Sequence, residues 1–151
     1  MDVKLRIYLD TSIFSAYYDD RAPDRRTQTE EFWTRIASFE ASTSELARDE
    51  LSRTPDGERR AKLLELLGRV KVHPVTEEIT KLAHHYVQAG VFAPVMVNDA
   101  VHIAAAVLRR NDILLSWNFK HMVNRTRRAK VNEVNVSQGL PGIEIIAPPE
   151  L

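Results

Sequence analysis

Residues 3–12 read Val3-Lys4-Leu5-Arg6-Ile7-Tyr8-Leu9-Asp10-Thr11-Ser12 and carry the clearest structural pattern of the chain. Leu5, Ile7 and Leu9 alternate with more polar neighbours, and this period of two predicts a β-strand. The strand leads directly into a carboxylate at Asp10, and the carboxyl ends of strands in α/β sheets are where ligands bind. Asp10 is therefore either a site residue or a cap of the helix that follows. This stretch alone leaves both interpretations open.

Outward from this strand, short apolar runs alternate with segments of helical spacing. Further strands are predicted at residues 41–44, 70–75, 113–117 and 143–146. The run at 113–117 is continuously apolar, which is typical of a strand buried on both faces. Strands that alternate with helices indicate an α/β fold, in which a short, mostly parallel sheet is covered by helices on both faces.

Four sequence signals predict where helices begin. Thr27-Gln28-Thr29-Glu30 has the spacing of a capping box, and Thr54-Pro55 combines a cap with proline at the first helical position. Thr76 precedes two acidic residues, which favour the positive end of a helix. Asn98 is expected to open the most apolar helix, over residues 99–110.

Composition narrows the class of protein. The chain has 151 residues, of which 44% are hydrophobic and 28% charged, so we expect one domain over residues 1–151. It has no cysteine, and charges at Asp2, Lys4 and Arg6 interrupt any apolar signal core. No apolar run approaches the length of a membrane span. We therefore expect a cytoplasmic protein with no membrane association.

Three acidic residues fall at the edges of the predicted elements. Asp10 follows the first strand, Glu50 lies within a helix and Asp99 begins the most apolar helix. Carboxylates that cluster repel one another, so a divalent cation is their natural partner, and hard oxygen ligands suit Mg²⁺ or Mn²⁺. Taken singly, each acid is equally explained as a helix cap or a solvated charge. The formal net charge is zero, so any binding of nucleic acid has to depend on a local basic patch or a metal.

Four motifs occur in order along nearly the whole chain. They read Ile7-Tyr8-Leu9-Asp10-Thr11-Ser12, Ser44-Glu45-Leu46-Ala47-Arg48-Asp49-Glu50-Leu51, Asn98-Asp99-Ala100-Val101-His102-Ile103-Ala104-Ala105-Ala106 and Leu115-Ser116-Trp117-Asn118-Phe119-Lys120-His121. Together they resemble the motifs of the PIN domain family, and within it the VapC-like toxins of type II toxin–antitoxin pairs. The resemblance implies a PIN-like three-layer α/β/α sandwich.

The resemblance also implies an activity. PIN domains of this kind are metal-dependent endoribonucleases, so we expect hydrolysis of RNA phosphodiester bonds with Mg²⁺ or Mn²⁺, an antitoxin protein as partner, and a homodimer. Carried over by motif, Asp10, Glu50 and Asp99 match the metal ligands, and Ser12 matches the hydroxyl residue that supports the first aspartate. The catalytic set is then Asp10, Glu50, Asp99, Asn118 and Ser12.

Asn118 is a departure from the family pattern. Many PIN domains carry an aspartate at this position of the fourth motif, whereas Asn118 offers a carbonyl oxygen but no negative charge. Three carboxylates suffice for one divalent ion, but a second ion would be held less well. Asn118 thus keeps one alternative open, a PIN-like module that binds RNA or protein without cutting it. A second alternative is a housekeeping PIN nuclease that has no antitoxin.

Further signals each have a structural and a functional interpretation. His102 lies one helical turn after Asp99, and is either a hydrogen-bonded core residue or a residue that faces the site. A basic segment follows the fourth motif, and it either grips a phosphate backbone or is a solvated helix face. Its members are Lys120, His121, Arg125, Arg127, Arg128 and Lys130.

The front of the chain is rich in aromatic residues. Most of them are expected in the core, and some are candidates for a groove that binds an antitoxin helix. This aromatic set consists of Phe14, Tyr17, Tyr18, Phe32, Trp33 and Phe39.

Overall fold

A five-stranded parallel sheet lies at the centre of the computed structural model, which describes residues 3–151. Met1 and Asp2, which the expected domain over residues 1–151 includes, lie outside the described residues. The strand order is β3-β2-β1-β4-β5, and every neighbouring pair is parallel. The strands are β1 (Arg6–Leu9), β2 (Glu40–Ser44), β3 (Lys71–His73), β4 (Ile113–Leu115) and β5 (Glu144–Ile146).

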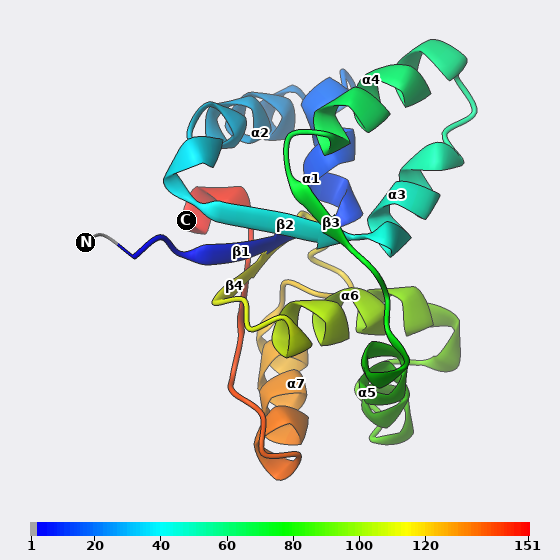
Figure 1. Ribbon diagram of the computed structural model, residues 1–151, viewed down its shortest axis with the longest axis vertical. Coiled ribbons are helices and arrows are strands. Elements are labelled where there is room, and N and C mark those ends of the chain that lie inside the picture. Colours follow the sequence, from blue (N-terminus) through cyan, green and yellow to red (C-terminus); the bar gives the residue numbers. More distant parts are fainter. Residues whose placement is uncertain (1–2) are drawn as a thin grey trace.

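Helices cover both faces of this sheet, which confirms the predicted three-layer α/β/α architecture (Figure 1). One layer holds α1 (Thr11–Ser15), α2 (Pro23–Thr34), α3 (Glu45–Ser52) and α4 (Gly57–Leu67). The other holds α5 (Glu77–Gln88), α6 (Val97–Leu108) and α7 (Arg125–Ser137). Short 3₁₀ turns are η1 (Ala16–Tyr18), η2 (Ile36–Ser38), η3 (Pro94–Met96) and η4 (Pro148–Glu150).

The strand predicted from the opening stretch is β1, and it lies between β2 and β4. Ile7, Tyr8 and Leu9 are all buried, although their alternation suggested one exposed face. A strand in the middle of a parallel sheet is covered by helices on both sides, so both faces must be filled. Tyr8 is consequently an interior side chain, and its hydroxyl needs a buried partner.

The aromatic front of the chain forms core. Phe14, Phe32 and Trp33 are at most 1% exposed, and their rings pack at 5.4 Å (Phe14–Trp33) and 6.0 Å (Phe32–Trp33) between centroids. The indole N–H of Trp33 donates to the Ile13 carbonyl at 3.1 Å. Phe14 and Trp33 therefore cannot anchor a groove, because neither side chain is accessible to a partner. Tyr17, Tyr18 and Phe39 are only partly buried, so a groove that uses them stays a prediction.

Three of the four predicted helix starts differ from the structure. The capping box at residues 27–30 is wrong, since α2 already begins at Pro23, whose ring fixes a helical φ four residues earlier. Asp56, not Thr54, caps α4, and Asn98 lies inside α6 instead of capping it. The start at Thr76 is confirmed, with its side chain accepting from Ile79 N–H.

None of the helices in residues 3–151 combines enough length with enough apolarity to cross a membrane.

Candidate active site

Three carboxylates gather at the carboxyl edge of the sheet. Asp10 directly follows β1, Glu50 lies on α3 immediately after β2, and Asp99 lies in the first turn of α6. Glu50 accepts a 2.7 Å hydrogen bond from His102, which lies one helical turn after Asp99 on α6, and the charges of all three acids raise the pKa of this buried imidazole. The three predicted acids therefore lie on neighbouring elements at this edge, and their joint role as metal ligands stays a prediction.

Asp10 is held by three donors and is only 5% exposed. Its Oδ1 accepts from Ser12 N–H at 2.6 Å and from the Ser12 hydroxyl at 2.5 Å. Its Oδ2 accepts from the Ser116 hydroxyl at 2.7 Å. The N–H of Trp117 donates to Ser12 Oγ at 2.8 Å, which ties the end of β1 to the segment after β4. Asp10 thus caps α1 and also presents an ordered carboxylate, so the two interpretations of the sequence are compatible.

Glu50 is half-buried and has one oxygen fixed. Its Oε1 accepts from the Thr11 hydroxyl at 2.7 Å and from His102 Nε2 at 2.7 Å. Burial raises the pKa of Glu50, but these hydrogen bonds and the charge of His102 outweigh burial and hold the pKa below its usual value. Glu50 is therefore a carboxylate at neutral pH, with Oε2 not engaged in any hydrogen bond within residues 3–151.

His102 belongs to the core and to the site at once. It is 2% exposed, and its Nδ1 lies 2.7 Å from the hydroxyl of Tyr8, which in turn lies 2.8 Å from Ser44 Oγ. Burial lowers the pKa of His102, but the hydrogen bond to Glu50 and the surrounding carboxylates raise it more. His102 consequently links the middle of the sheet to Glu50.

Asp99 pairs with His121, whose Nδ1 lies 3.0 Å from Asp99 Oδ2. Burial raises the pKa of Asp99 and the charge of Asp10 adds to this, while His121 only partly offsets both. An ionised Asp99 is therefore costly for this fold unless a cation accompanies it.

Asn118 shapes the loop that carries His121. Its side-chain oxygen accepts from His121 N–H at 3.0 Å, and its own N–H donates to Ser116 Oγ at 2.9 Å. Among the described residues it makes no hydrogen bond to Asp10, Glu50 or Asp99. The structure thus uses the amide of Asn118 to hold a turn, and the turn sets His121 against Asp99.

A divalent cation suits the donor chemistry of this edge. The available donors are carboxylate oxygens, which Mg²⁺ and Mn²⁺ prefer, and Asp99 Oδ1, like Glu50 Oε2, accepts no hydrogen bond from residues 3–151. Within that same range, no three His, Asp or Glu side chains already form a metal-ligand group. The residues fit such a cation chemically, and side-chain rotation is needed to bring all three onto one ion.

Several contacting residues were not predicted as site residues. Thr11 and Ser116 stand beside Asp10 and Asn118 in the motifs, but nothing in their spacing identified them as donors to the carboxylates. His121 was grouped with the basic segment, although it pairs with Asp99. His102 carried a usable signal, because a residue three positions after Asp99 lies on the same helix face.

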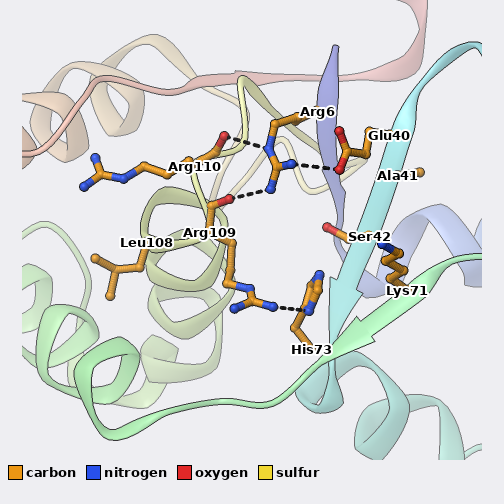
Figure 2. A pocket seen from close by; sticks show the side chains of 9 residues that line it. All are labelled: Arg6, Glu40, Ala41, Ser42, Lys71, His73, Leu108, Arg109 and Arg110. Atoms are coloured by element: carbon orange, nitrogen blue, oxygen red, sulfur yellow. Dashed lines mark hydrogen bonds and ion pairs between the residues drawn. The ribbon is translucent and has the colours of Figure 1, made fainter. Parts of the chain in front are cut away.

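A cavity lined partly by basic side chains lies at the opposite edge of the sheet. It has a volume of about 440 Å³ and is bounded by the starts of β1, β2 and β3 and by the end of α6 (Figure 2). Arg6 donates there to the carbonyls of Arg109 and Arg110, at 2.9 and 3.1 Å, and pairs with Glu40 at 2.8 Å (Figure 2). These contacts satisfy the carbonyls that α6 leaves open at its C-terminus. The Arg6 side chain thus caps the C-terminus of α6. None of the three predicted acids lines this cavity.

Comparison with known proteins agrees with this geometry. A family model for the PIN domain matches residues 7–119. No curated protein sequence matches the chain. Among solved structures, FitAcB from Neisseria gonorrhoeae aligns with a TM-score of 0.61 at 14% identity, covering 96% of this chain and 99% of that one.

Two further structures are similar to the chain. VapBC2 from Rickettsia felis, bound to a DNA fragment from its promoter, aligns with a TM-score of 0.58 at 17% identity and covers 95% of this chain and 98% of that one. VapC20 from Mycobacterium tuberculosis, a toxin that cleaves the sarcin-ricin loop, aligns with a TM-score of 0.53 at 20% identity and covers 72% and 86%. At these identities the likeness establishes a shared fold.

Proposed function

The chain belongs to the PIN domain family, and from this premise we propose that it is a metal-dependent endoribonuclease and the toxin of a type II toxin–antitoxin pair. One observation carries the proposal: inside the matched region, Glu50 is hydrogen-bonded at 2.7 Å to His102, which lies one turn after Asp99 on α6, and Asp10 directly follows the strand whose Tyr8 contacts the same imidazole. Structural neighbours that are toxin–antitoxin complexes support the same function.

We assign the metal-binding role to Asp10, Glu50 and Asp99, with Mg²⁺ or Mn²⁺ as the cation. A bound divalent cation supplies Lewis acidity toward the phosphate and lowers the pKa of water. Ser12 and Ser116 orient Asp10, and Thr11 with His102 orients Glu50. Asn118 acts indirectly, by holding His121 against Asp99. The chain supplies no carboxylate at Asn118, which favours one cation over two.

The remaining partners are proposals of the same kind. An antitoxin protein is the expected inhibitor, since solved neighbours include toxin–antitoxin complexes. We also propose that the protein is a homodimer, that it is cytoplasmic, and that residues 1–151 form a single nuclease domain.

RNA is expected to approach over the loop that follows Asn118. Phe119 is 43% exposed, and together with Lys120 and Lys130 it lines a cavity of about 490 Å³ beside this loop. An exposed aromatic ring next to two cations suits a stacked base and its phosphates.

The two central arginines of the basic segment are engaged within the fold. Arg127 donates to the Val91 carbonyl and lies 4.5 Å over the Phe92 ring. Arg128 donates to the Ile145 carbonyl at 3.1 Å and pairs with Glu150 at 3.9 Å. The basic segment is therefore neither fully exposed to solvent nor free along its whole length to bind phosphates. Its exposed lysines, Lys120 and Lys130, are the better candidates for RNA contact.

Replacing both Lys120 and Lys130 with alanine is expected to weaken RNA binding and to flatten its salt dependence. Each lost phosphate contact lowers the slope of log K against log salt by about 0.7 for a single strand. Fluorescence anisotropy over a salt series measures the slope. The matched control replaces Lys4 and Lys71, exposed residues at the opposite edge of the sheet, and leaves the slope unchanged. An equal slope of log K against log salt for both double variants would contradict RNA binding at Lys120 and Lys130.

Cleavage of labelled single-stranded, ribosomal and transfer RNA by the purified chain tests the function. We expect cleavage with Mn²⁺ or Mg²⁺ and none with EDTA. Calorimetric titration with Mn²⁺ is the second measurement, because a nuclease selective for one RNA still binds its cation.

A module that binds without cutting is the second candidate. It is favoured by one observation, that the three carboxylates do not form a ready ligand group in residues 3–151. Absence of both cleavage and Mn²⁺ binding would support this candidate and reject the nuclease.

A further inference from the structure

We infer that His102, itself held by a buried hydrogen bond to Tyr8, is a positioning residue that fixes Glu50 by donating to one of its oxygens, so that the other oxygen of Glu50 stays available to the cation. The inference rests on the proposed function. It concerns a residue that touches neither RNA nor the reacting atoms and acts only through Glu50.

The direction of the bond to Glu50 follows from donor and acceptor chemistry. An ionised carboxylate only accepts, so the 2.7 Å contact between His102 Nε2 and Glu50 Oε1 requires a proton on Nε2, which both the neutral and the charged imidazole can carry. Nδ1 lies 2.7 Å from the Tyr8 hydroxyl, which lies 2.8 Å from Ser44 Oγ. Both ring nitrogens are therefore engaged, and the ring is held in the orientation that directs Nε2 at Glu50.

The anchors of these hydrogen bonds are rigid parts of the fold. Tyr8 lies in the central strand β1 and is 1% exposed, Ser44 ends β2 and is 1% exposed, and His102 lies on the buried helix α6. Glu50, by contrast, is 29% exposed on a helix of eight residues and has three rotatable side-chain bonds. Without the imidazole, only the Thr11 hydroxyl would restrain it.

The contacts also select which oxygen of Glu50 is used. Thr11 and His102 both donate to Oε1, and Oε2 accepts no hydrogen bond within residues 3–151. Carboxylates that bind metals are commonly oriented in this way by a neighbouring donor, and loss of such a donor weakens metal affinity or activity by about 10- to 100-fold.

If the role of His102 were purely structural, the protein would need different properties of this side chain. The core needs the volume of the imidazole and a partner for the Tyr8 hydroxyl, but not a donor aimed at Glu50. Two amide variants separate these demands. The side-chain nitrogen of His102→Gln reaches the position of Nε2, whereas that of the shorter His102→Asn reaches only the position of Nδ1.

We expect His102→Asn to lower kcat for RNA cleavage by about 10- to 100-fold with little change in KM, and to weaken Mn²⁺ binding in calorimetry by a similar factor. His102→Gln should recover most of both losses at a comparable Tm. Crystal structures of the two variants should have Glu50 in its original rotamer only with Gln. His84→Asn, an exposed histidine on α5, is the control and should behave as the parent.

Equal kcat, equal Mn²⁺ affinity and the same Glu50 rotamer in both amide variants would overturn the inference while leaving the nuclease intact. If the parent neither cleaves RNA nor binds Mn²⁺, the proposed function fails, and the Glu50 rotamer still decides the positioning claim. If His102→Asn does not fold, Tyr8→Phe is the second variant, because it keeps the imidazole and removes only the hydrogen-bond partner of Nδ1. An unchanged kcat in Tyr8→Phe would then overturn the inference.

Discussion

Replacing Asp99 with asparagine is expected to lower RNA cleavage by at least about 100-fold and to leave the folded protein at least as stable as the parent. The loss of activity follows because an asparagine at this position would offer the cation no negative charge. The stability follows because burial and the charge of Asp10 raise the pKa of Asp99, so the fold favours the neutral form that asparagine mimics.

Two measurements on one preparation check this prediction. Cleavage is followed with labelled RNA and saturating Mn²⁺, and the free energy of unfolding is obtained by urea titration in EDTA. Asp49→Asn is the matched control, since Asp49 is an exposed acid beside Glu50 and should change neither quantity. Full activity in the Asp99 variant would contradict the assignment of Asp99 to the site.

Trp33→Ala is expected to lower the free energy of unfolding by about 3–5 kcal/mol. The indole is 1% exposed and packs against Phe14 and Phe32, and the Arg69 guanidinium lies 5.3 Å from its ring. Its removal leaves a cavity and an unpaired Ile13 carbonyl. Urea unfolding followed by circular dichroism measures the loss.

Val136→Ala is the control for this prediction. Val136 is 73% exposed, so its truncation should change the free energy of unfolding by no more than about 0.5 kcal/mol. A similar loss in both variants would mean that Trp33 is not the interior residue described above. The prediction also bears on partner binding, because failure of a Trp33 variant to bind an antitoxin would reflect unfolding and not a lost contact.

The layered architecture was predictable because it depends on local pattern. Parallel strands need apolar runs, and the runs at β1, β4 and β5 are short and flanked by polar turns. Helix starts were less predictable. Thr27 to Glu30 carries the right residue types for a cap, but Pro23 starts the helix earlier and tertiary packing uses Thr29 as the acceptor of the Trp117 indole N–H.

The sequence by itself determined which residues bear charge and in what order they follow the strands. Asp10 follows a strand and Asp99 lies in the first turn of a helix, and a parallel topology brings such positions to one edge, whereas Glu50 lies inside α3. The order of the motifs was enough to predict membership of the PIN domain family. That the three acids form one metal site stays a prediction.

Only the tertiary structure decided how each of these carboxylates is held. Tyr8 and His102 are 94 positions apart, and Glu50 and His102 are 52 apart, so no local pattern links them. Their contacts arise because α6 packs on the sheet against β2 and β4, and because buried polar atoms need hydrogen-bond partners in the low-dielectric interior. The position of Asn118 was also decided by the tertiary structure. Its side-chain oxygen accepts from the N–H of His121 in the same turn and makes no hydrogen bond to the three acids among the described residues.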